Sequence, residues 1–233
     1  MSAEKFYWQG KKLFDEEKYE EALKAFHQAL KDEDHTLSLY GRALSYFKMQ
    51  RFQEAIQDFD KLLNLIPNNA TYLSERGVAL HLAGNNQAAL QDFDKAVELE
   101  PDNPYRYSSR AYIKDRMKDF QGSVDDYTKA IELDPEDAIS YNNRGLVEEK
   151  LGYKDKAKKN FDIADRLMPA KPREEQVQER QGQENGQNGF PEIKSENKPR
   201  FKQYLEVMGS VFSSRQNLKE FVDFVGNKLK SDK

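Results

Sequence analysis

Arginine and aspartate recur together in this sequence at a spacing that could form ion pairs. Aspartate follows arginine by sixteen residues three times, in the pairs Arg42 and Asp58, Arg76 and Asp92, and Arg110 and Asp126. A guanidinium and a carboxylate form bidentate, charge-assisted hydrogen bonds, and pairs that recur in a repeated pattern are more often structural than catalytic. In the next period Asn160 follows Arg144 at the same distance, which weakens the pairing there. The spacing predicts structural ion pairs, each joining two helices of one unit.

Residues that could carry out catalysis or bind a metal ion lack the spacing that such sites need. The three histidines, His27, His35 and His81, occur at no metal-ligand spacing. The sequence contains no Gly-rich phosphate loop, no His-Glu-x-x-His and no Gly-x-Ser-x-Gly. Because cysteine is absent, disulfide and thiolate chemistry are excluded. We therefore predict a protein that is not an enzyme and that uses no cofactor or metal ion.

The ion-pair residues belong to a 34-residue repeat that runs from Thr36 to Pro169. Prolines mark its period at Pro67, Pro101, Pro135 and Pro169. Small residues recur at Ala43, Gly77, Ala111 and Gly145 and again at Ala55, Ala89, Ser123 and Ala157, and aromatic residues recur at Phe59, Phe93, Tyr127 and Phe161. One apolar column becomes polar in its last two members, reading Tyr46, Leu80, Lys114 and Glu148. Columns that stay in phase over four periods indicate a repeat protein.

Each 34-residue unit contains two runs with helical spacing, joined by a short turn. The small residues suit the close crossing of two helices, and the proline ends the second helix because it lacks an N–H group. One helix pair cannot bury its apolar face alone, whereas stacked pairs can. The sequence therefore predicts an all-α fold, a right-handed α-solenoid of antiparallel helix pairs.

The columns resemble the tetratricopeptide repeat family, and the resemblance covers Ala3 to Pro169. It implies one solenoid domain over residues 1–169, with five repeats at about 3–34, 36–67, 70–101, 104–135 and 138–169. The first repeat lacks the proline and has Gln9 where the others have arginine. An atypical first unit is expected of a capping repeat, because one of its faces meets water.

The resemblance also implies that the first helices of successive repeats line a concave groove that binds a protein or peptide. The expected partner-binding residues are Tyr7, Trp8, Lys11, Tyr40, Leu44, Phe47, Glu75, Val78, Tyr105, Ser109, Tyr112, Asn142 and Asn143. Aromatic residues are plentiful among them, and tyrosine and tryptophan are typical anchors in protein interfaces. The family's chaperone-binding members grip a C-terminal carboxylate with a lysine, asparagine and arginine set. No such set is complete here, so the sequence disfavours an acidic chaperone tail as the ligand.

The composition changes after Pro169. Residues 170–198 are rich in Gln, Glu, Lys, Asn and Gly, a composition that predicts a disordered linker. Residues 199–233 become amphipathic again and predict a helical tail. The apolar residues expected to dock this tail on a surface are Phe201, Leu205, Met208, Phe212, Leu218, Phe221 and Val225.

Charge suggests the surface that the tail covers. Residues 199–233 carry seven Lys or Arg and four Asp or Glu, whereas residues 1–169 carry a net charge of −6. Opposite charges favour docking of the tail on its own repeats, either as a C-terminal cap or in the groove, although salt weakens the attraction. Self-association through the tail and binding of the tail to a separate partner are the alternatives.

The composition also bears on the classes of partner. The net charge of −4 argues against nucleic acid, which normally requires a basic face. No apolar run is long enough to cross a membrane, and residues 1–10 do not read as a secretion signal, so a cytoplasmic location is expected. The sequence predicts a protein-interaction adaptor or scaffold with a peptide or helix in its groove, and a C-terminal helix that regulates or caps it. The alternative is a structural protein that self-assembles into a homo-oligomer through the tail.

Overall fold

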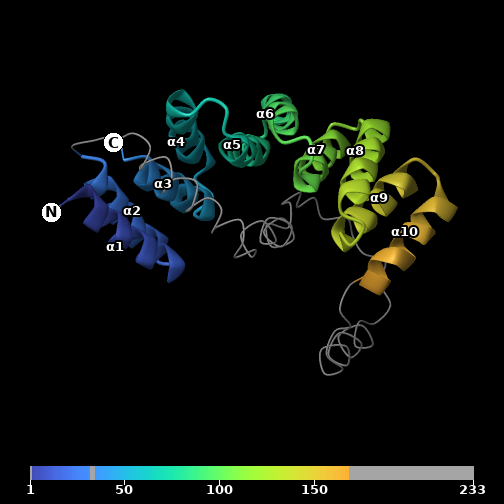
Figure 1. Ribbon diagram of the computed structural model, residues 1–233, viewed down its shortest axis with the longest axis horizontal. Coiled ribbons are helices and arrows are strands. Elements are labelled where there is room, and N and C mark those ends of the chain that lie inside the picture. The colour runs from blue at the N-terminus through green and yellow to red at the C-terminus, as the bar shows by residue number, and fades with distance from the viewer. Residues whose placement is uncertain (1, 32–34, 168–233) are drawn as a thin grey trace, which may run out of the picture. The chain divides into compact units, whose positions relative to one another are not determined.

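The computed structural model describes residues 2–31 and 35–167, and these residues form ten α-helices and no strand (Figure 1). In chain order the helices are α1 (Ala3–Asp15), α2 (Tyr19–Ala29), α3 (Thr36–Lys48), α4 (Phe52–Leu65), α5 (Ala70–Leu82), α6 (Asn86–Leu99), α7 (Pro104–Arg116), α8 (Phe120–Leu133), α9 (Ala138–Lys150) and α10 (Lys154–Leu167). Each odd-numbered helix packs against the even-numbered helix that follows it, and each even-numbered helix packs against the next odd-numbered helix. The predicted all-α solenoid is therefore confirmed.

The chain divides into two compact units, Met1–Pro169 and Ala170–Lys233. The ten helices all belong to the first unit. The predicted linker at 170–198 and the predicted amphipathic tail at 199–233, with its docking residues, lie outside the described residues.

The repeated aromatic column forms the centre of each helix pair. Phe26, Phe59, Phe93 and Tyr127 are at most 2% exposed. Glycine makes room for the first of these rings, because a Cβ added at Gly10 or Gly41 would lie 2.6 or 2.5 Å from a ring carbon of Phe26. The aromatic side chain therefore packs directly against the backbone of neighbouring helices, which requires small residues there.

The turn inside each repeat uses a left-handed residue. Glu17, Gln50, Gly84, Lys118 and Gly152 have φ between 59° and 89° and occupy equivalent places after α1, α3, α5, α7 and α9. The amide that follows Glu17 donates to the carbonyl of Leu13, and equivalent bonds close the other turns. These bonds satisfy carbonyls at the end of the first helix. Glycine occupies only two of the five places, so the other three carry the strain of a side chain at positive φ.

Side chains in the joins between repeats cap the next helix. Asn69 accepts from the amide of Tyr72 at 2.9 Å, Asn103 from that of Tyr105 at 3.1 Å, and Asp137 from that of Ile139 at 3.0 Å. The first join uses a histidine instead, because His35 Nδ1 accepts from the amide of Ser38 at 3.2 Å. Each cap satisfies an amide that has no partner inside the helix.

The last helix differs from the earlier even-numbered helices on the side where a next repeat would stack. Leu63, Val97 and Ile131 each retain 8% exposure, and α4, α6 and α8, which carry them, pack on the following repeat. The equivalent residue of α10 is Asp165, which is exposed. A second apolar column, Ile56, Leu90 and Val124, becomes the exposed Lys158 in α10. This polar surface ends the stack without requiring another repeat.

Candidate protein-interaction face

All thirteen residues predicted to bind a partner lie on odd-numbered helices. These helices also contact one another along the stack. The rings of Tyr40 on α3 and Tyr72 on α5 lie 5.3 Å apart, and those of His81 on α5 and Tyr112 on α7 lie 5.5 Å apart. Lys150 of α9 donates to Asp115 of α7 at 2.6 Å. We call the side chains that α1, α3, α5, α7 and α9 turn away from the even-numbered helices the odd-helix face.

The predicted partner-binding residues differ in exposure. Trp8 is the most exposed of them, at 58%. Nine are partly buried: Tyr7, Lys11, Tyr40, Leu44, Tyr105, Ser109, Tyr112, Asn142 and Asn143. The remaining three, Phe47, Glu75 and Val78, are buried. One of the partly buried polar groups, Asn143, accepts a hydrogen bond from the side-chain amide of Asn142 at 3.4 Å.

A buried carboxylate lies at the centre of this face. Glu75 of α5 is 3% exposed, and burial raises the pKa of its carboxyl to about 7, although the positive charges of Arg106 and Lys48 oppose the rise. Burial also raises the pKa of the Tyr40 and Tyr105 hydroxyls, and the charge of Glu75 adds to both rises.

Arg106 joins the third repeat to the fourth beside Glu75. The side chain of Arg106 is 7% exposed, and its Nε donates to Glu100 at 2.8 Å. Its Nη1 donates to the Ser74 hydroxyl at 2.9 Å, and its Nη2 donates to the Thr71 hydroxyl at 3.3 Å. All three guanidinium nitrogens of Arg106 are therefore occupied by groups other than Glu75. The column that contains Arg106 reads Ser38, Tyr72 and Ser140 elsewhere, so this contact has no periodic pattern that could predict it.

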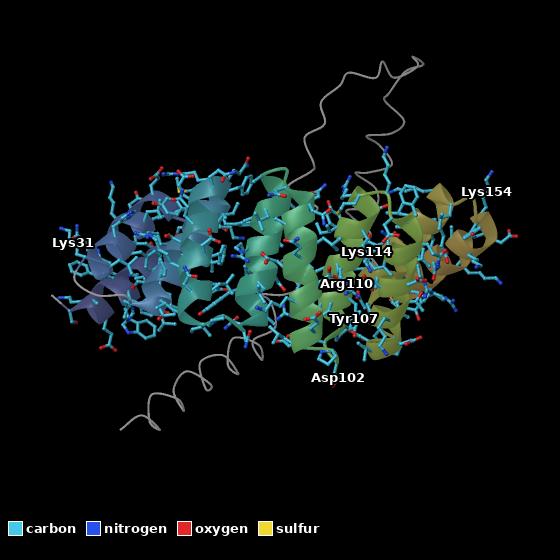
Figure 2. All side chains as sticks on the ribbon, turned by 90° about the horizontal axis from the view of Figure 1, so that it is seen from above. Lys31, Asp102, Tyr107, Arg110, Lys114 and Lys154 are labelled. Atoms are coloured by element: carbon cyan, nitrogen blue, oxygen red, sulfur yellow. The ribbon has the colours of Figure 1, made fainter. Side chains whose placement is uncertain are left out.

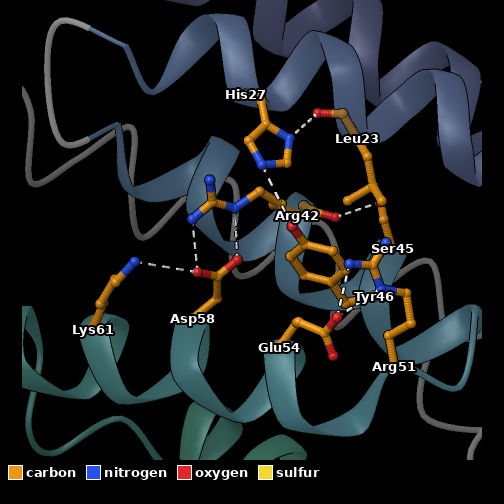
Figure 3. Close-up of polar contacts among 10 residues, drawn as sticks. Leu23, His27, Arg42, Ser45, Tyr46, Arg51, Glu54, Asp58 and Lys61 are labelled. Atoms are coloured by element: carbon orange, nitrogen blue, oxygen red, sulfur yellow. Dashed lines mark hydrogen bonds and ion pairs between the residues drawn. The ribbon is translucent and has the colours of Figure 1, made fainter.

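The predicted arginine–aspartate pairs form behind the face, between the two helices of a repeat. Arg42 donates to Asp58 through Nε and Nη2, both at 2.7 Å, and Lys61 lies 3.7 Å from the same carboxylate (Figure 3). Arg76 binds Asp92 at 2.8 and 2.6 Å, and Arg110 binds Asp126 at 2.8 and 2.7 Å. The bidentate pairing predicted from the sixteen-residue spacing is confirmed in these three repeats.

The same arginines also bind the preceding repeat, which the sequence analysis did not predict. Arg76 Nη1 donates to Asp60 of α4 at 2.8 Å, and Arg110 Nη1 donates to Asp94 of α6 at 3.0 Å. These aspartates precede their arginines by sixteen residues, so the periodicity did contain a signal for them. Each arginine thus connects three helices and fixes how one repeat sits on the next.

In the fourth and fifth repeats, the polar residues Lys114 and Glu148 join this network. They belong to the column that is apolar in the second and third repeats, at Tyr46 and Leu80. Lys114 lies one turn after Arg110 on α7 (Figure 2) and binds Asp126 at 2.8 Å. Glu148 is 5% exposed and accepts from the Asn160 amide at 2.6 Å. Asn160 in turn accepts from Arg144 at 2.7 Å. The two polar residues therefore have partners inside their own repeats.

Arg144 is less completely bound than the other arginines. It meets the Thr128 hydroxyl at 3.1 Å instead of a carboxylate of the preceding repeat. Its Nε is buried without a hydrogen-bond partner. The weaker pairing predicted from Asn160 in place of an aspartate is confirmed, and Asn160 links Arg144 to Glu148 through two hydrogen bonds.

The described residues contain no group of three or more His, Cys, Asp or Glu that could hold a metal ion. Within residues 2–31 and 35–167, no helix has the length and apolar character that crossing a membrane requires.

A stack of five helix pairs with one continuous face is a helical-repeat solenoid. Profiles of the tetratricopeptide repeat match residues 7–70, 40–104 and 138–167, and a TPR repeat profile matches residues 116–152. Together these matches extend over more than half of the sequence. The chain belongs to the tetratricopeptide repeat family.

Solved structures with the same fold include several of MamA. One crystal structure of MamA is 23% identical, with a TM-score of 0.63, and covers 73% of this chain and 96% of its own. MamA from residue 41 to its end, from Desulfovibrio magneticus RS-1, is 20% identical with a TM-score of 0.67, and covers 71% of this chain and 94% of its own. YrrB, described as a TPR protein with an unusual peptide-binding site, is 20% identical with a TM-score of 0.60, and covers 76% of this chain and 90% of its own. At these identities the likeness shows the fold alone. No curated protein matches the sequence significantly.

Proposed function

We propose that the protein is a non-catalytic cytoplasmic adaptor whose odd-helix face binds a peptide or helix of another protein. The observation that carries this proposal is the presence of partly exposed aromatic side chains on three odd-numbered helices: Tyr7 on α1, Tyr40 on α3, and Tyr105 and Tyr112 on α7. Aromatic side chains provide large contact areas for a ligand at a low cost in conformational entropy. The peptide-binding site named for YrrB, a protein of the same fold, is consistent with this use of the stack.

Affinity capture with matched variants tests the proposal. Tyr112→Ala and Asn142→Ala remove side chains of the odd-helix face, whereas Gln57→Ala and Gln91→Ala remove exposed side chains from the even-numbered helices. We expect the first two variants to reduce the capture of a specific partner at least about tenfold, because interface energy concentrates in a few residues. The two glutamine variants should capture as much partner as the wild type. Loss of capture in the glutamine variants alone would place the interface on the other side of the stack.

Residues 199–233 act, in this proposal, as a competitor for the same face. Their positive charge complements the net charge of −6 on residues 1–169. The structure gives less support to the other form of tail docking, a cap stacked on α10, because Lys158 and Asp165 replace the apolar residues that hold a following repeat. Deletion of residues 199–233 should therefore raise partner affinity. A lower midpoint of thermal unfolding would instead favour the cap, and unchanged affinity and stability would reject both forms.

Self-assembly is the second candidate function. A head-to-tail contact between copies would place the exposed Asp162 of α10, the equivalent of Asp60 and Asp94, against the first repeat of the next copy. The first repeat has Gln9 where an arginine would have to be, so the arginine network does not continue between copies. Exchange of the tail between chains remains as a route to oligomers. Sedimentation velocity at several concentrations distinguishes the functions, since a strict monomer excludes the assembly.

A further inference from the structure

Lys150, the last residue of α9, shows how the stack neutralises a cation at the end of an odd-numbered helix. Its Nζ binds both carboxylate oxygens of Asp115 on α7, at 2.6 and 2.7 Å. Arg116 occupies the same place one repeat earlier, as the last residue of α7. The residue that corresponds to Asp115 there is His81 of α5, which is not an acid. The pairing that satisfies Lys150 is therefore not available to Arg116.

The side chain of Arg116 is exposed but held in place by its neighbour Tyr112. Its Nη2 donates to the hydroxyl of Tyr112 at 3.0 Å, and its guanidinium carbon lies 5.0 Å from the centre of the same ring. The adjacent acid, Asp115, is bound by Lys150. In the part of the chain that the structure describes, no carboxylate forms an ion pair with Arg116. A guanidinium held in this way loses little further conformational entropy when it binds an anion.

The charge of Arg116 acts on a histidine of the preceding repeat. The ring of Tyr112, which holds Arg116, lies 5.5 Å from the ring of His81. Burial lowers the pKa of the His81 imidazole, and the positive charge of Arg116 adds to this effect, although a hydrogen bond with Asn86 opposes it. Residues 1–169 carry a net charge of −6, yet this part of the odd-helix face carries a cation without an acidic partner.

An exposed leucine lies on the same part of the odd-helix face. Leu146 of α9 is 45% exposed, whereas Leu44 and Tyr112 of its column are partly buried and Val78 is buried. Leu146 precedes Lys150 by one helical turn, and Lys150 is bonded to the residue next to Arg116. An apolar surface and an unpaired cation are therefore presented together by α7 and α9.

We propose that Arg116 and Leu146 receive an acidic and an apolar side chain from one segment of a partner protein. This inference rests on the proposed binding of a protein ligand to the odd-helix face, and it names the chemistry that the ligand carries. A carboxylate accepts charge-assisted hydrogen bonds from a guanidinium, and an apolar side chain on Leu146 removes apolar surface from water. The sequence lacks a complete set for gripping a C-terminal carboxylate, so the acid is an Asp or Glu within the segment.

A phage-displayed library of short random peptides, selected on the full chain, supplies the probes. We expect the selected peptides to share an Asp or Glu and a large apolar residue. One such peptide is synthesised with an amidated C-terminus, and its binding to the full chain is measured by fluorescence anisotropy. Arg116→Gln should weaken the binding about tenfold, the usual effect of losing one charge-assisted bond. Leu146→Ala should weaken it about fivefold, because less apolar surface is buried.

Arg51 and Leu65 provide matched controls outside the odd-helix face. The guanidinium of Arg51 also lies over a tyrosine ring, 4.7 Å from the centre of Tyr46, but it is paired with Glu54. Leu65 ends α4 and is 48% exposed, which is close to the exposure of Leu146. Arg51→Gln and Leu65→Ala should bind the peptide as tightly as the wild type does.

A double-mutant cycle separates a direct contact from a change in the fold. Replacement of the acid of the peptide by its amide should weaken the binding to the wild type about tenfold. The same replacement should have little further effect on the binding to Arg116→Gln, because the two groups that it uncouples are then already apart. Additive effects would show that Arg116 does not contact the acid, and they would overturn the proposal.

The remaining outcomes distinguish this inference from the proposed function. Peptides that bind Arg116→Gln as tightly as the wild type but lose affinity for Asn142→Ala would overturn the pairing and leave a ligand on the odd-helix face. Peptides that bind only with a free C-terminal carboxylate would also overturn the acidic side chain. A library that yields no specific binder, for the full chain or for a chain ending at Pro169, would overturn both this inference and the proposed function.

Discussion

Removal of an arginine between the helices should cost far more stability than removal of an arginine from an exposed ion pair. Arg76 bridges Asp92, whose side chain is 8% exposed, and Asp60 of the preceding repeat. Arg76→Ala leaves the buried Asp92 carboxylate without its partner, so we expect the free energy of unfolding to fall by about 2 to 4 kcal/mol. Arg51, whose pair with Glu54 is exposed, is the control, and Arg51→Ala should leave the free energy of unfolding almost unchanged. Urea denaturation measures both values, and similar values for the two variants would contradict this account.

The fifth repeat can be converted to the arrangement of the fourth. In the fourth repeat Lys114 and Arg110 share Asp126, whereas in the fifth Glu148 and Arg144 share Asn160. Glu148→Lys alone should be strongly destabilising, because it places a second buried cation beside Arg144 without a carboxylate. Adding Asn160→Asp supplies that carboxylate, so the double variant should recover the lost stability.

A double-mutant cycle measures the effect at these two positions. We expect a coupling free energy of at least about 2 kcal/mol, at the upper part of the range for residues in one network. Additive effects would show that the fifth repeat does not tolerate the fourth repeat's network.

Glu75 makes stability depend on pH in a direction opposite to that of a salt-bridged acid. Burial raises the pKa of its carboxyl from 4.5 to about 7, so the folded state holds its proton more tightly than the unfolded state does. The free energy of unfolding should therefore fall as the pH rises from about 4.5 to about 7. The free energies of unfolding of Glu75→Gln and the wild type are compared in a chain ending at Pro169. The difference in favour of Glu75→Gln should be about 3 kcal/mol larger at pH 8 than at pH 4.5. A constant difference between the two chains across this range would contradict the raised pKa.

Sequence reasoning found only part of this chemistry. The pairs within a repeat, such as Arg42 and Asp58, follow from the period. The bridges to Asp60 and Asp94 have the same spacing and were missed because each arginine was assigned one partner. The contacts of Arg106 occur at one junction only, so periodicity cannot reveal them.

At the scale of the helices, the turn inside each repeat offers a way to stabilise the stack. Lys118 and Gln50 adopt φ of 67° and 60°, where a side chain is strained and glycine is not. Lys118→Gly and Gln50→Gly should each raise the free energy of unfolding by up to about 1 kcal/mol. Gly84 adopts φ of 89°, and Gly84→Ala should lower the free energy of unfolding by a similar amount. Thermal unfolding measures all three, and a loss of stability in both glycine variants would refute the strain.

The positions of the helices were largely predictable, because proline, glycine and the aromatic column repeat at fixed intervals. The exposure of individual side chains on the odd-helix face was not. Phe47 and Val78 occupy the same type of column as partly exposed residues yet are buried, since exposure depends on the neighbours that the stack brings next to each side chain. The repeat period predicts the face of the helix on which a residue lies, whereas its exposure depends on how the neighbouring helices pack.

At the scale of the whole chain, the two ends of the stack differ from its middle. The first repeat has no arginine in the network, and the last presents Lys158 and Asp165 where inner repeats carry apolar residues. This arrangement favours a stack of fixed length over a repeating assembly. The surface left for recognition is the odd-helix face, and the account depends on its binding a protein ligand.

Site-specific photo-crosslinking in cells tests that claim most directly. A benzoylphenylalanine is placed in the full chain at Tyr112 or Asn142 on the odd-helix face, and at Gln57 or Gln91 on even-numbered helices. The account predicts that a defined protein, or residues 199–233 themselves, crosslinks at the first two positions and not at the glutamine positions. Crosslinks that occur equally from Gln57 and Gln91, or only from them, would contradict it.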